Sequence, residues 1–309
     1  MKRKPLQAQN QLSAFFELTK PRITMLILVS TALGYYLGNT GNTNIYNFFL
    51  TMFGTALLSG GAGAINHYVE RDLDKLMDRT KSRPIPSGLI MASTALYFGL
   101  ILSIFGLLIL CVAINLLSGI LGLFTVLLYI FVYTPLKRIT WLNTTIGAIP
   151  GAMPALGGWA AAANQLDPNA WILFSILFLW QHPHFYAIAL MCKKDYAKAG
   201  FKMLPVIEKE NFRTNRQILW HAFLLIPVSL FFVVTGILGN FYFWGALALG
   251  IAYLISGIPL LRDTTIDNAK LLLKTSVIYL PALLIIIFID LNLSLIHISE
   301  PTRPERIAY

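Results

Sequence analysis

Acidic and basic side chains gather in one short segment, residues 66–84, which reads NHYVERDLDKLMDRTKSRP. Charged residues are only 12% of the chain, whereas hydrophobic residues are 56%. Within the segment, Asn66, Glu70, Asp74 and Asp78 recur at every fourth position. Each step of four residues rotates an α-helix by about 40° beyond a full turn. The first three of these oxygen-bearing side chains therefore share one helix face.

Carboxylate and amide oxygens at this spacing predict a magnesium site. Mg²⁺ prefers near-octahedral oxygen coordination and is usually held by one or two carboxylates together with substrate phosphates. We therefore expect Asn66, Glu70 and Asp74 to hold Mg²⁺. The basic residues between the acids are expected to bind diphosphate, because guanidinium and ammonium groups form charge-assisted hydrogen bonds with phosphate. These residues are Arg71, Arg79, Lys81 and Arg83. The simpler alternative is a solvated loop whose charges pair with one another.

A second polar segment contains Asp195 among several lysines. Two facing acidic loops suit one diphosphate held with metal, as in two-metal sites. We therefore expect Asp195 to add a metal contact, with Lys194 and Tyr196 near the phosphates. The alternative is that Asp195 is a surface counter-ion. Nearby, His184 is a candidate to coordinate iron or to hold a proton, and His182 is a weaker one. The alternative is a histidine that is only hydrogen-bonded near a helix end. The residues expected to carry the chemistry are Asn66, Glu70, Asp74, Arg79 and Asp195.

Composition indicates the class of protein that must position these residues. The mean hydropathy is +0.66, and 56% apolar residues exceed what soluble domains contain. A stretch of roughly 20 apolar residues can cross the hydrocarbon core of a bilayer. We expect an all-α polytopic membrane protein with nine transmembrane helices around a central cavity. The expected spans are residues 23–38, 46–65, 91–112, 115–134, 141–162, 169–190, 217–238, 241–261 and 271–290. Only Asn115 separates the third span from the fourth.

The distribution of basic residues predicts the orientation, because Lys and Arg near span ends stay on the cytoplasmic side. Basic residues precede the first span and then fall in alternate connections, while the other connections contain none. The N-terminus and every charged loop should therefore be cytoplasmic. The net charge of +10 follows from this topology and from anionic lipid, so no nucleic-acid partner is expected. The basic start lacks the apolar core of a cleaved signal peptide. It is also short for a mitochondrial transit peptide, which favours a bacterial inner membrane.

Two spans have a composition that suits a ligand cavity. The second span ends in SGGAGAIN, whose small residues permit close helix contacts or contact with a bulky ligand. Residues 133–162 are rich in Gly and Pro, which predicts a kinked or broken helix beside a cavity. Lys137 and Arg138 should lie at the cytoplasmic mouth of that cavity. The alternative is that both only anchor the span at the membrane surface.

The two ends of the chain are expected to lie outside the transmembrane domain of residues 23–292. Residues 1–22 should form a cytoplasmic arm. The stretch LSLIHISEPTRP near the C-terminus resembles the translation of an adapter used to prepare sequencing libraries, so residues 293–309 are expected to be a non-native tail. Cys111 and Cys192 occupy different spans without CxxC spacing, which predicts neither a disulfide nor a zinc site.

Several of these motifs resemble the UbiA-type intramembrane prenyltransferases. The positions similar to the first Asp-rich motif of that superfamily are Asn66, Glu70, Asp74, Arg79, Thr80, Arg83 and Pro84. Glu70 stands where Asp is commoner. Three further stretches resemble the haem-directed branch, the protohaem IX farnesyltransferases or haem O synthases. They are YTPLKR, NTTIGAIPGAMPALGGW, and WQHPHF followed by DYAKAGFKMLP. The resemblance covers about residues 19–290 and implies a UbiA-like fold.

The resemblance also implies a reaction. Farnesyl diphosphate would lose diphosphate with the help of Mg²⁺, and its C1 would join the vinyl group of haem b to give haem O. Aromatic faces would stabilise the allylic cation, and basic residues would hold the haem propionates. The aromatic candidates are Tyr133, Trp180, Phe185 and Tyr186; the propionate candidates are Lys137 and Arg138, with His184 in the same pocket. Haem A synthase or the assembly of a terminal oxidase would supply the protein partners.

Two other functions fit the same residues. An aromatic prenyltransferase that makes quinone precursors would take a phenolic acid as acceptor, so an assay of haem b against 4-hydroxybenzoate separates it from a haem-directed enzyme. A haem or lipid carrier would bind without reacting. Such a carrier would not depend on Mg²⁺ and would tolerate the loss of Glu70 and Asp74.

Overall fold

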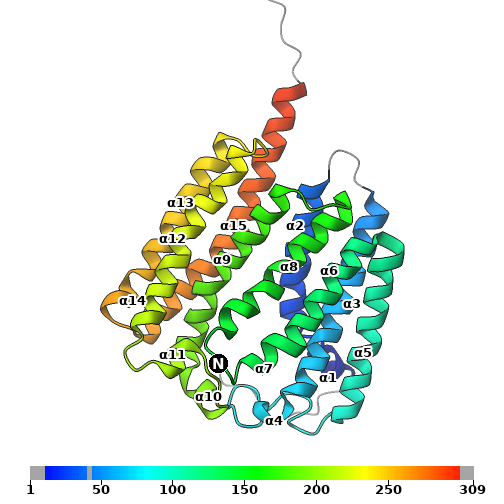
Figure 1. Cartoon of the computed structure of the whole chain (residues 1–309), viewed down its shortest axis with the longest axis vertical. Coiled ribbons are helices and arrows are strands. Elements are labelled where there is room, and N and C mark those ends of the chain that lie inside the picture. The colour runs from blue at the N-terminus through cyan, green and yellow to red at the C-terminus, as the bar shows by residue number, and fades with distance from the viewer. Residues whose placement is uncertain (1–10, 40–43, 300–309) are drawn as a thin grey trace, which may run out of the picture.

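The computed structural model describes residues 11–39 and 44–299, with side chains as far as residue 293. Long helices run side by side in one bundle (Figure 1), and the described residues contain no strand. Eight of these helical stretches are long and apolar enough to cross a membrane. They are α3 (Ile45–Val69), α5 (Ala92–Leu108) with a π-helical turn, α6 (Leu116–Leu127) with its extension to Leu136, α8 (Asn143–Ala163), α9 (Pro168–Met191), α12 (Phe212–Val234), α13 (Asn240–Gly257) with α14 (Pro259–Arg262), and α15 (Ile266–Ser299).

The remaining expected span, the first in the chain (residues 23–38), corresponds to helix α2 (Pro21–Gly38). It has 18 residues and begins with Pro21 and Arg22, and it is shorter than the other eight stretches. It lies directly against α8, because a Cβ added at Gly34 would overlap the carbonyl of Ala155. The bundle therefore holds eight helices that meet the length and hydropathy of a membrane span and one shorter helix packed among them.

Asn115 separates the third and fourth spans, as the sequence predicts. Its side-chain oxygen accepts a hydrogen bond from the backbone N–H of Ser118 at 2.8 Å, which caps the start of α6. Its side-chain amide donates to the carbonyl of Ala160 in α8 at 2.8 Å. One polar residue thus ends one helix, starts the next and ties both to a third.

The sequence predicts a kink or a break in this Gly- and Pro-rich stretch, and helix α8 shows no break between Asn143 and Ala163. Pro150 and Pro154 both lie inside the helix. The small residues serve close packing instead, because a Cβ added at Gly158 would overlap the carbonyl of Thr31 in α2. Small residues that let helix backbones approach are typical of membrane helix contacts.

One end of the bundle carries the short helices and most of the polar loops (Figure 1). Helix α1 (Gln11–Leu18) buries Ala14 and Leu18 in a small cluster there. The short helices α4 (Arg71–Asp74), α10 (Lys193–Lys198) and α11 (Leu204–Ile207) lie at the same end. At the other end of the chain the backbone of α15 continues to Ser299, and the rest of the expected tail lies outside the described residues.

The two polar loops pack against each other at this end. Met77 of the first loop shares a buried apolar cluster with Tyr196 and Phe201 of the second. The backbone N–H of Arg79 donates to Oδ2 of Asp195 at 3.3 Å. The loops at residues 66–88 and 191–214 therefore form one continuous cover over the interior of the bundle.

Candidate active site

A cavity of about 500 Å³ lies beneath this cover, between helices α2, α3, α6, α8 and α9. It is within the size range of small-molecule sites. Eleven of the residues expected from the sequence line it: Asn66, Glu70, Asp74, Arg79, Arg83, Tyr133, Lys137, Trp180, His184, Phe185 and Tyr196. The structure thus brings together groups that lie more than a hundred positions apart in the chain.

The three oxygen-bearing residues at four-residue spacing face this cavity, although they do not belong to one helix. Helix α3 ends at Val69, and α4 begins at Arg71. The helical register nevertheless continues, because the N–H of Glu70 bonds to the carbonyl of Asn66 at 2.9 Å, and the N–H of Asp74 bonds to that of Glu70 at 2.8 Å. The sequence prediction of a shared face is therefore correct for these three residues.

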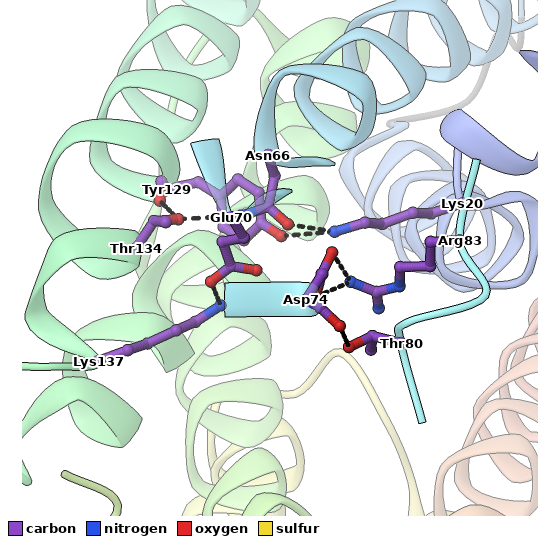
Figure 2. A network of polar contacts seen from close by, with 9 residues as sticks. All are labelled: Lys20, Asn66, Glu70, Asp74, Thr80, Arg83, Tyr129, Thr134 and Lys137. Atoms are coloured by element: carbon purple, nitrogen blue, oxygen red, sulfur yellow. Dashed lines mark hydrogen bonds and ion pairs between the residues drawn. The ribbon is translucent and has the colours of Figure 1, made fainter. Parts of the chain in front are cut away.

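Each of these three side chains binds a different cation of the protein (Figure 2). Lys20 donates a short hydrogen bond to the side-chain oxygen of Asn66. Lys137 donates to Oε1 of Glu70 at 2.6 Å. Nη1 of Arg83 lies 2.8 and 2.7 Å from the two carboxylate oxygens of Asp74, whose side chain has no exposed surface.

Neighbouring groups hold these residues in place. The side-chain amide of Asn66 donates to the hydroxyl of Thr134 at 3.2 Å, and that hydroxyl donates to the carbonyl of Tyr129 at 2.8 Å. The hydroxyl of Thr80 donates to the backbone carbonyl of Asp74 at 2.9 Å. These bonds fix the orientation of Asn66 and the turn that carries Asp74, so the oxygens are positioned before any substrate arrives.

The charges of this cluster support one another. Burial raises the pKa of the Glu70 carboxyl, but Lys137 and Lys20 lower it by more, so its net pKa is below the ordinary value. Burial lowers the pKa of the Lys137 ammonium, while Tyr133 and Glu70 raise it, and its net pKa is above the ordinary value. Burial also lowers the pKa of Lys20 to about 7, despite the opposing effect of Glu70. Glu70 and Lys137 therefore form a charged pair in the wall of the cavity.

The second loop contributes less to the cavity than the sequence suggests. Tyr196 lines the cavity and lies beneath Arg79, whose guanidinium is 5.9 Å from the ring centre. Asp195 is not among the lining residues, and its carboxylate is occupied by the backbone N–H of Arg79. Lys194 is exposed. The structure does not bring Asp195 together with Asn66 and Glu70.

Three of the expected basic residues also lie away from the cavity. Arg71 stacks on the ring of Tyr68, 4.5 Å from its centre. Lys81 pairs with Asp78 at 2.7 Å on the surface. Arg138 is exposed, one position beyond the buried Lys137. The sequence shows that these residues are basic and near the membrane surface, but it does not show which way each one points.

One face of α9 supplies the aromatic part of the cavity wall. Trp180, His184 and Phe185 line the cavity, as expected, together with Gln181 and Ile188. These positions follow the three-to-four-residue period of one helix face. Two other candidates on this helix, Tyr186 and the weaker histidine candidate His182, do not line the cavity.

Tyr186 and His182 lie on faces of α9 that pack into the protein. Tyr186 is 1% exposed and belongs to the main apolar core. His182 is fully buried, and its ring stacks on that of His221 with centres 3.9 Å apart. Neither residue is among those that line the cavity.

Sequence reasoning missed Lys20, Tyr129 and Thr134. Lys20 reaches the cavity because it adopts a left-handed conformation (φ 50°) immediately before α2 and extends to a residue 46 positions later. Its place at the start of the first span, on the membrane side expected for the acidic segment, was the available indication. Tyr129 lies just before the YTPLKR stretch and Thr134 lies within it, and neither carries a charge that would mark it as a site residue.

The donor set of this site fits a hard divalent cation such as Mg²⁺. The oxygens of three side chains already attract cationic groups from three different segments (Figure 2). In the part of the chain that the structure describes, no three His, Cys, Asp or Glu side chains meet at one point. A few carboxylates completed by substrate phosphates are the usual Mg²⁺ arrangement, so Asn66, Glu70 and Asp74 suit a metal that arrives with a diphosphate.

Comparison with protein families gives one match over most of the chain. The UbiA prenyltransferase family matches residues 27–278. A protoheme IX farnesyltransferase of Solibacter usitatus (strain Ellin6076) is 47% identical over 285 residues, which cover 89% of this chain and 98% of the relative. A protoheme IX farnesyltransferase of Salinibacter ruber (strain DSM 13855 / M31) is 40% identical over 273 residues, which cover 88% of this chain and 96% of the relative.

Solved structures share the same fold at low sequence identity. A structure of digeranylgeranylglyceryl phosphate synthase superposes with a TM-score of 0.77 at 19% identity, covering 92% of this chain and 99% of that one. A UbiA homologue from Archaeoglobus fulgidus, bound to DMAPP and Mg²⁺, superposes with a TM-score of 0.69 at 19% identity, covering 91% and 99% of the two chains.

Proposed function

Because this chain belongs to the UbiA prenyltransferase family, we propose that it transfers the farnesyl group of farnesyl diphosphate to the vinyl group of haem b. The products are haem O and diphosphate. The similarity to protoheme IX farnesyltransferases over almost their whole length supports this choice of substrates. The single observation in the molecule that carries the proposal is one cavity with a charged end and an apolar remainder.

The charged end suits diphosphate. Lys20, Arg79 and Arg83 line it together with Asn66, Glu70 and Asp74. When bound, Mg²⁺ held by Asn66, Glu70 and Asp74 would neutralise charge on the diphosphate oxygens. The three basic side chains supply further positive charge where the leaving group gains negative charge as the C1–O bond breaks. Fixed charge of this kind is usually the largest contribution to catalysis.

The apolar remainder suits the farnesyl chain. Residues of α2 such as Ile23 and Leu26 line the cavity and are also exposed, at 53% and 61%. The cavity therefore opens sideways between helices, toward the space that lipid would occupy. A membrane-dissolved chain can enter by this route while its diphosphate stays beneath the polar cover.

Aromatic rings in the cavity wall would stabilise the allylic cation. Tyr133, Trp180 and Phe185 line it, and π faces attract cations at short range. The bond from farnesyl C1 forms to a vinyl carbon of haem b, and the cation left on the porphyrin side chain takes up water and releases a proton. The apolar wall keeps bulk water from the first cation, which would otherwise yield farnesol.

We further place the protein in a bacterial inner membrane, with its N-terminus and the loops at residues 66–88 and 191–214 in the cytoplasm. The basic residues support this orientation, because they concentrate at the end of the bundle that carries these loops. Haem A synthase, or the assembly of a terminal oxidase, would use the product.

A product assay tests the proposal. The purified protein in lipid nanodiscs receives farnesyl diphosphate and Mg²⁺ with either haem b or 4-hydroxybenzoate, and products are identified by mass spectrometry. The proposal predicts haem O from the first mixture only. Farnesylated 4-hydroxybenzoate would indicate a quinone-precursor enzyme, and haem binding without any product would indicate a carrier.

A further inference from the structure

His184 differs from the other histidines whose side chains the structure describes. It lines the cavity, whereas His67 and His182 are almost fully buried. His182 uses both ring nitrogens, bonding to the carbonyl of Phe178 at 2.7 Å and to the hydroxyl of Thr145 at 3.3 Å. His221 packs on His182 and is not among the lining residues. Of the four histidines whose side chains are described, His184 alone lines the cavity and can present its imidazole to a bound substrate.

The hydrogen bond of His184 to Ser276 in α15 determines its tautomer. Nδ1 of His184 lies 2.8 Å from the hydroxyl oxygen of Ser276. Ser276 has a single hydroxyl proton, which it donates to the carbonyl of Leu273 at 2.6 Å. The Ser276 oxygen must therefore accept the proton of Nδ1–H. The neutral imidazole then carries its free electron pair on Nε2.

The ring of His184 is also held in one orientation. The indole ring of Trp180 stacks on it, with ring centres 5.1 Å apart and planes inclined by 26°. The indole N–H of Trp180 in turn donates to the carbonyl of Ser276 at 2.9 Å. Histidines that bind metals typically donate their other ring N–H to a fixed acceptor, which sets the tautomer and the ring direction. The Ser276 hydroxyl fills that role here.

We propose that Nε2 of His184 is an axial ligand of the haem iron when the porphyrin substrate binds in this cavity. Among the described residues Nε2 has no hydrogen-bond partner, and imidazole nitrogen is a usual ligand of haem iron. This inference rests on the proposed function, since it takes haem as the acceptor. Ligation would fix the position of the porphyrin in the cavity, and it would favour iron-containing porphyrin over metal-free porphyrin.

A binding experiment without farnesyl diphosphate tests this assignment separately from turnover. The wild-type protein, His184→Ala and His184→Gln are titrated with ferric haem b, and the Soret band and electron paramagnetic resonance spectrum are recorded. The same proteins are titrated with metal-free protoporphyrin IX. His221→Ala, which changes a histidine outside the cavity, is the matched control. Ser276→Ala keeps the imidazole but removes the acceptor for Nδ1–H.

The proposal predicts histidine-ligated haem spectra for the wild type and for His221→Ala, and loss of that spectrum in both His184 variants. Their haem dissociation constants should rise by at least about ten-fold, while those for protoporphyrin IX should stay unchanged. Ser276→Ala should weaken haem binding by on the order of 10-fold. Added imidazole should restore the ligated spectrum to His184→Ala.

Two results would overturn the proposal. One is an unchanged haem spectrum in the His184 variants; the other is an equal loss of affinity for haem and protoporphyrin, which would mean that His184 only packs against the ring. Either result together with normal haem O formation by the wild type would leave the proposed function intact. Absence of haem O formation by the wild type would count against the function instead.

Discussion

The ammonium of Lys137 lies 2.6 Å from Oε1 of Glu70, although the two residues are 67 positions apart and both side chains are buried. This pair fixes one of the proposed magnesium ligands to the end of another helix. Removing one member of a buried pair leaves the other charge uncompensated, which typically costs about 3–5 kcal/mol. The contact therefore joins the stability of the bundle to the geometry of its site.

Lys137→Met should strongly destabilise the protein, because it leaves the Glu70 carboxylate buried without its partner. The loss should be largest at neutral pH and smaller near pH 5, since Glu70 in the variant can take up a proton and lose its charge. Thermal unfolding in detergent at both pH values measures this. The double variant Glu70→Gln/Lys137→Met should regain much of the stability but not the turnover. Equal stability of Lys137→Met and the wild type at neutral pH would contradict a charged pair.

Lys20→Met should weaken the binding of farnesyl diphosphate by about ten-fold or more, because a hydrogen bond to a charged group is worth roughly 1.5–3 kcal/mol. The matched control is Lys198→Met, which changes a surface lysine paired with Asp78 at 2.5 Å. Exposed pairs contribute little, so this control should bind as the wild type does. Isothermal titration with a non-hydrolysable farnesyl diphosphate analogue compares them. Equal affinities for all three proteins would exclude Lys20 from the diphosphate site.

Gly158→Ala should lower the thermal unfolding temperature, because the added methyl group would overlap the carbonyl of Thr31 and push α2 away from α8. Overpacking of this kind typically costs about 1–3 kcal/mol. Its neighbour Gly157 has no other atom within 4 Å of an added Cβ, so Gly157→Ala should be neutral or slightly stabilising. A similar melting temperature for both variants would show that α2 does not depend on this contact.

Deletion of residues 293–309 should leave haem O formation unchanged. Among the described side chains, the last hydrogen bonds from α15 to another part of the chain come before the deletion, where Asp290 accepts from the backbone N–H of Gly239 at 2.5 Å and of Tyr242 at 2.9 Å. Asp290→Ala, by contrast, should lower stability by about 1–3 kcal/mol, because it leaves a buried donor unpaired. Turnover per folded protein measures the effect of the deletion, and thermal unfolding measures the effect of Asp290→Ala. A large loss in the deletion variant would show that the tail is functional.

Much of the fold was predictable because local patterns determine it. Apolar length indicates the spans, and Asn115 marks the boundary between two of them, since a capping residue acts within one turn. The spacing of Asn66, Glu70 and Asp74 predicted their shared direction because hydrogen bonds four residues apart persist across the end of α3. These features depend on neighbours in the sequence.

The remainder of the site depends on contacts between distant segments. The place of Lys20 at the start of the first span indicates the membrane side but not that its ammonium reaches Asn66. Nothing near Arg138 indicates that it points away while Lys137 points inward. The composition of α8 predicts a kink or a break, yet the helix is unbroken, and its small residue Gly158 serves close contact with α2. The direction of such side chains follows from tertiary packing, which cannot be deduced from the spacing of residues within one segment.

The most direct test of the proposed site is Asp74→Ala, with Asp74→Asn as a variant of nearly equal volume. Haem binding and farnesyl transfer are measured separately on each purified protein across a Mg²⁺ titration. Both variants should lose essentially all turnover at every Mg²⁺ concentration, because the carboxylate is proposed to hold the metal that the diphosphate needs, while the haem dissociation constant should stay near the wild-type value. Normal turnover in either folded variant, or a defect confined to haem affinity, would contradict the metal assignment.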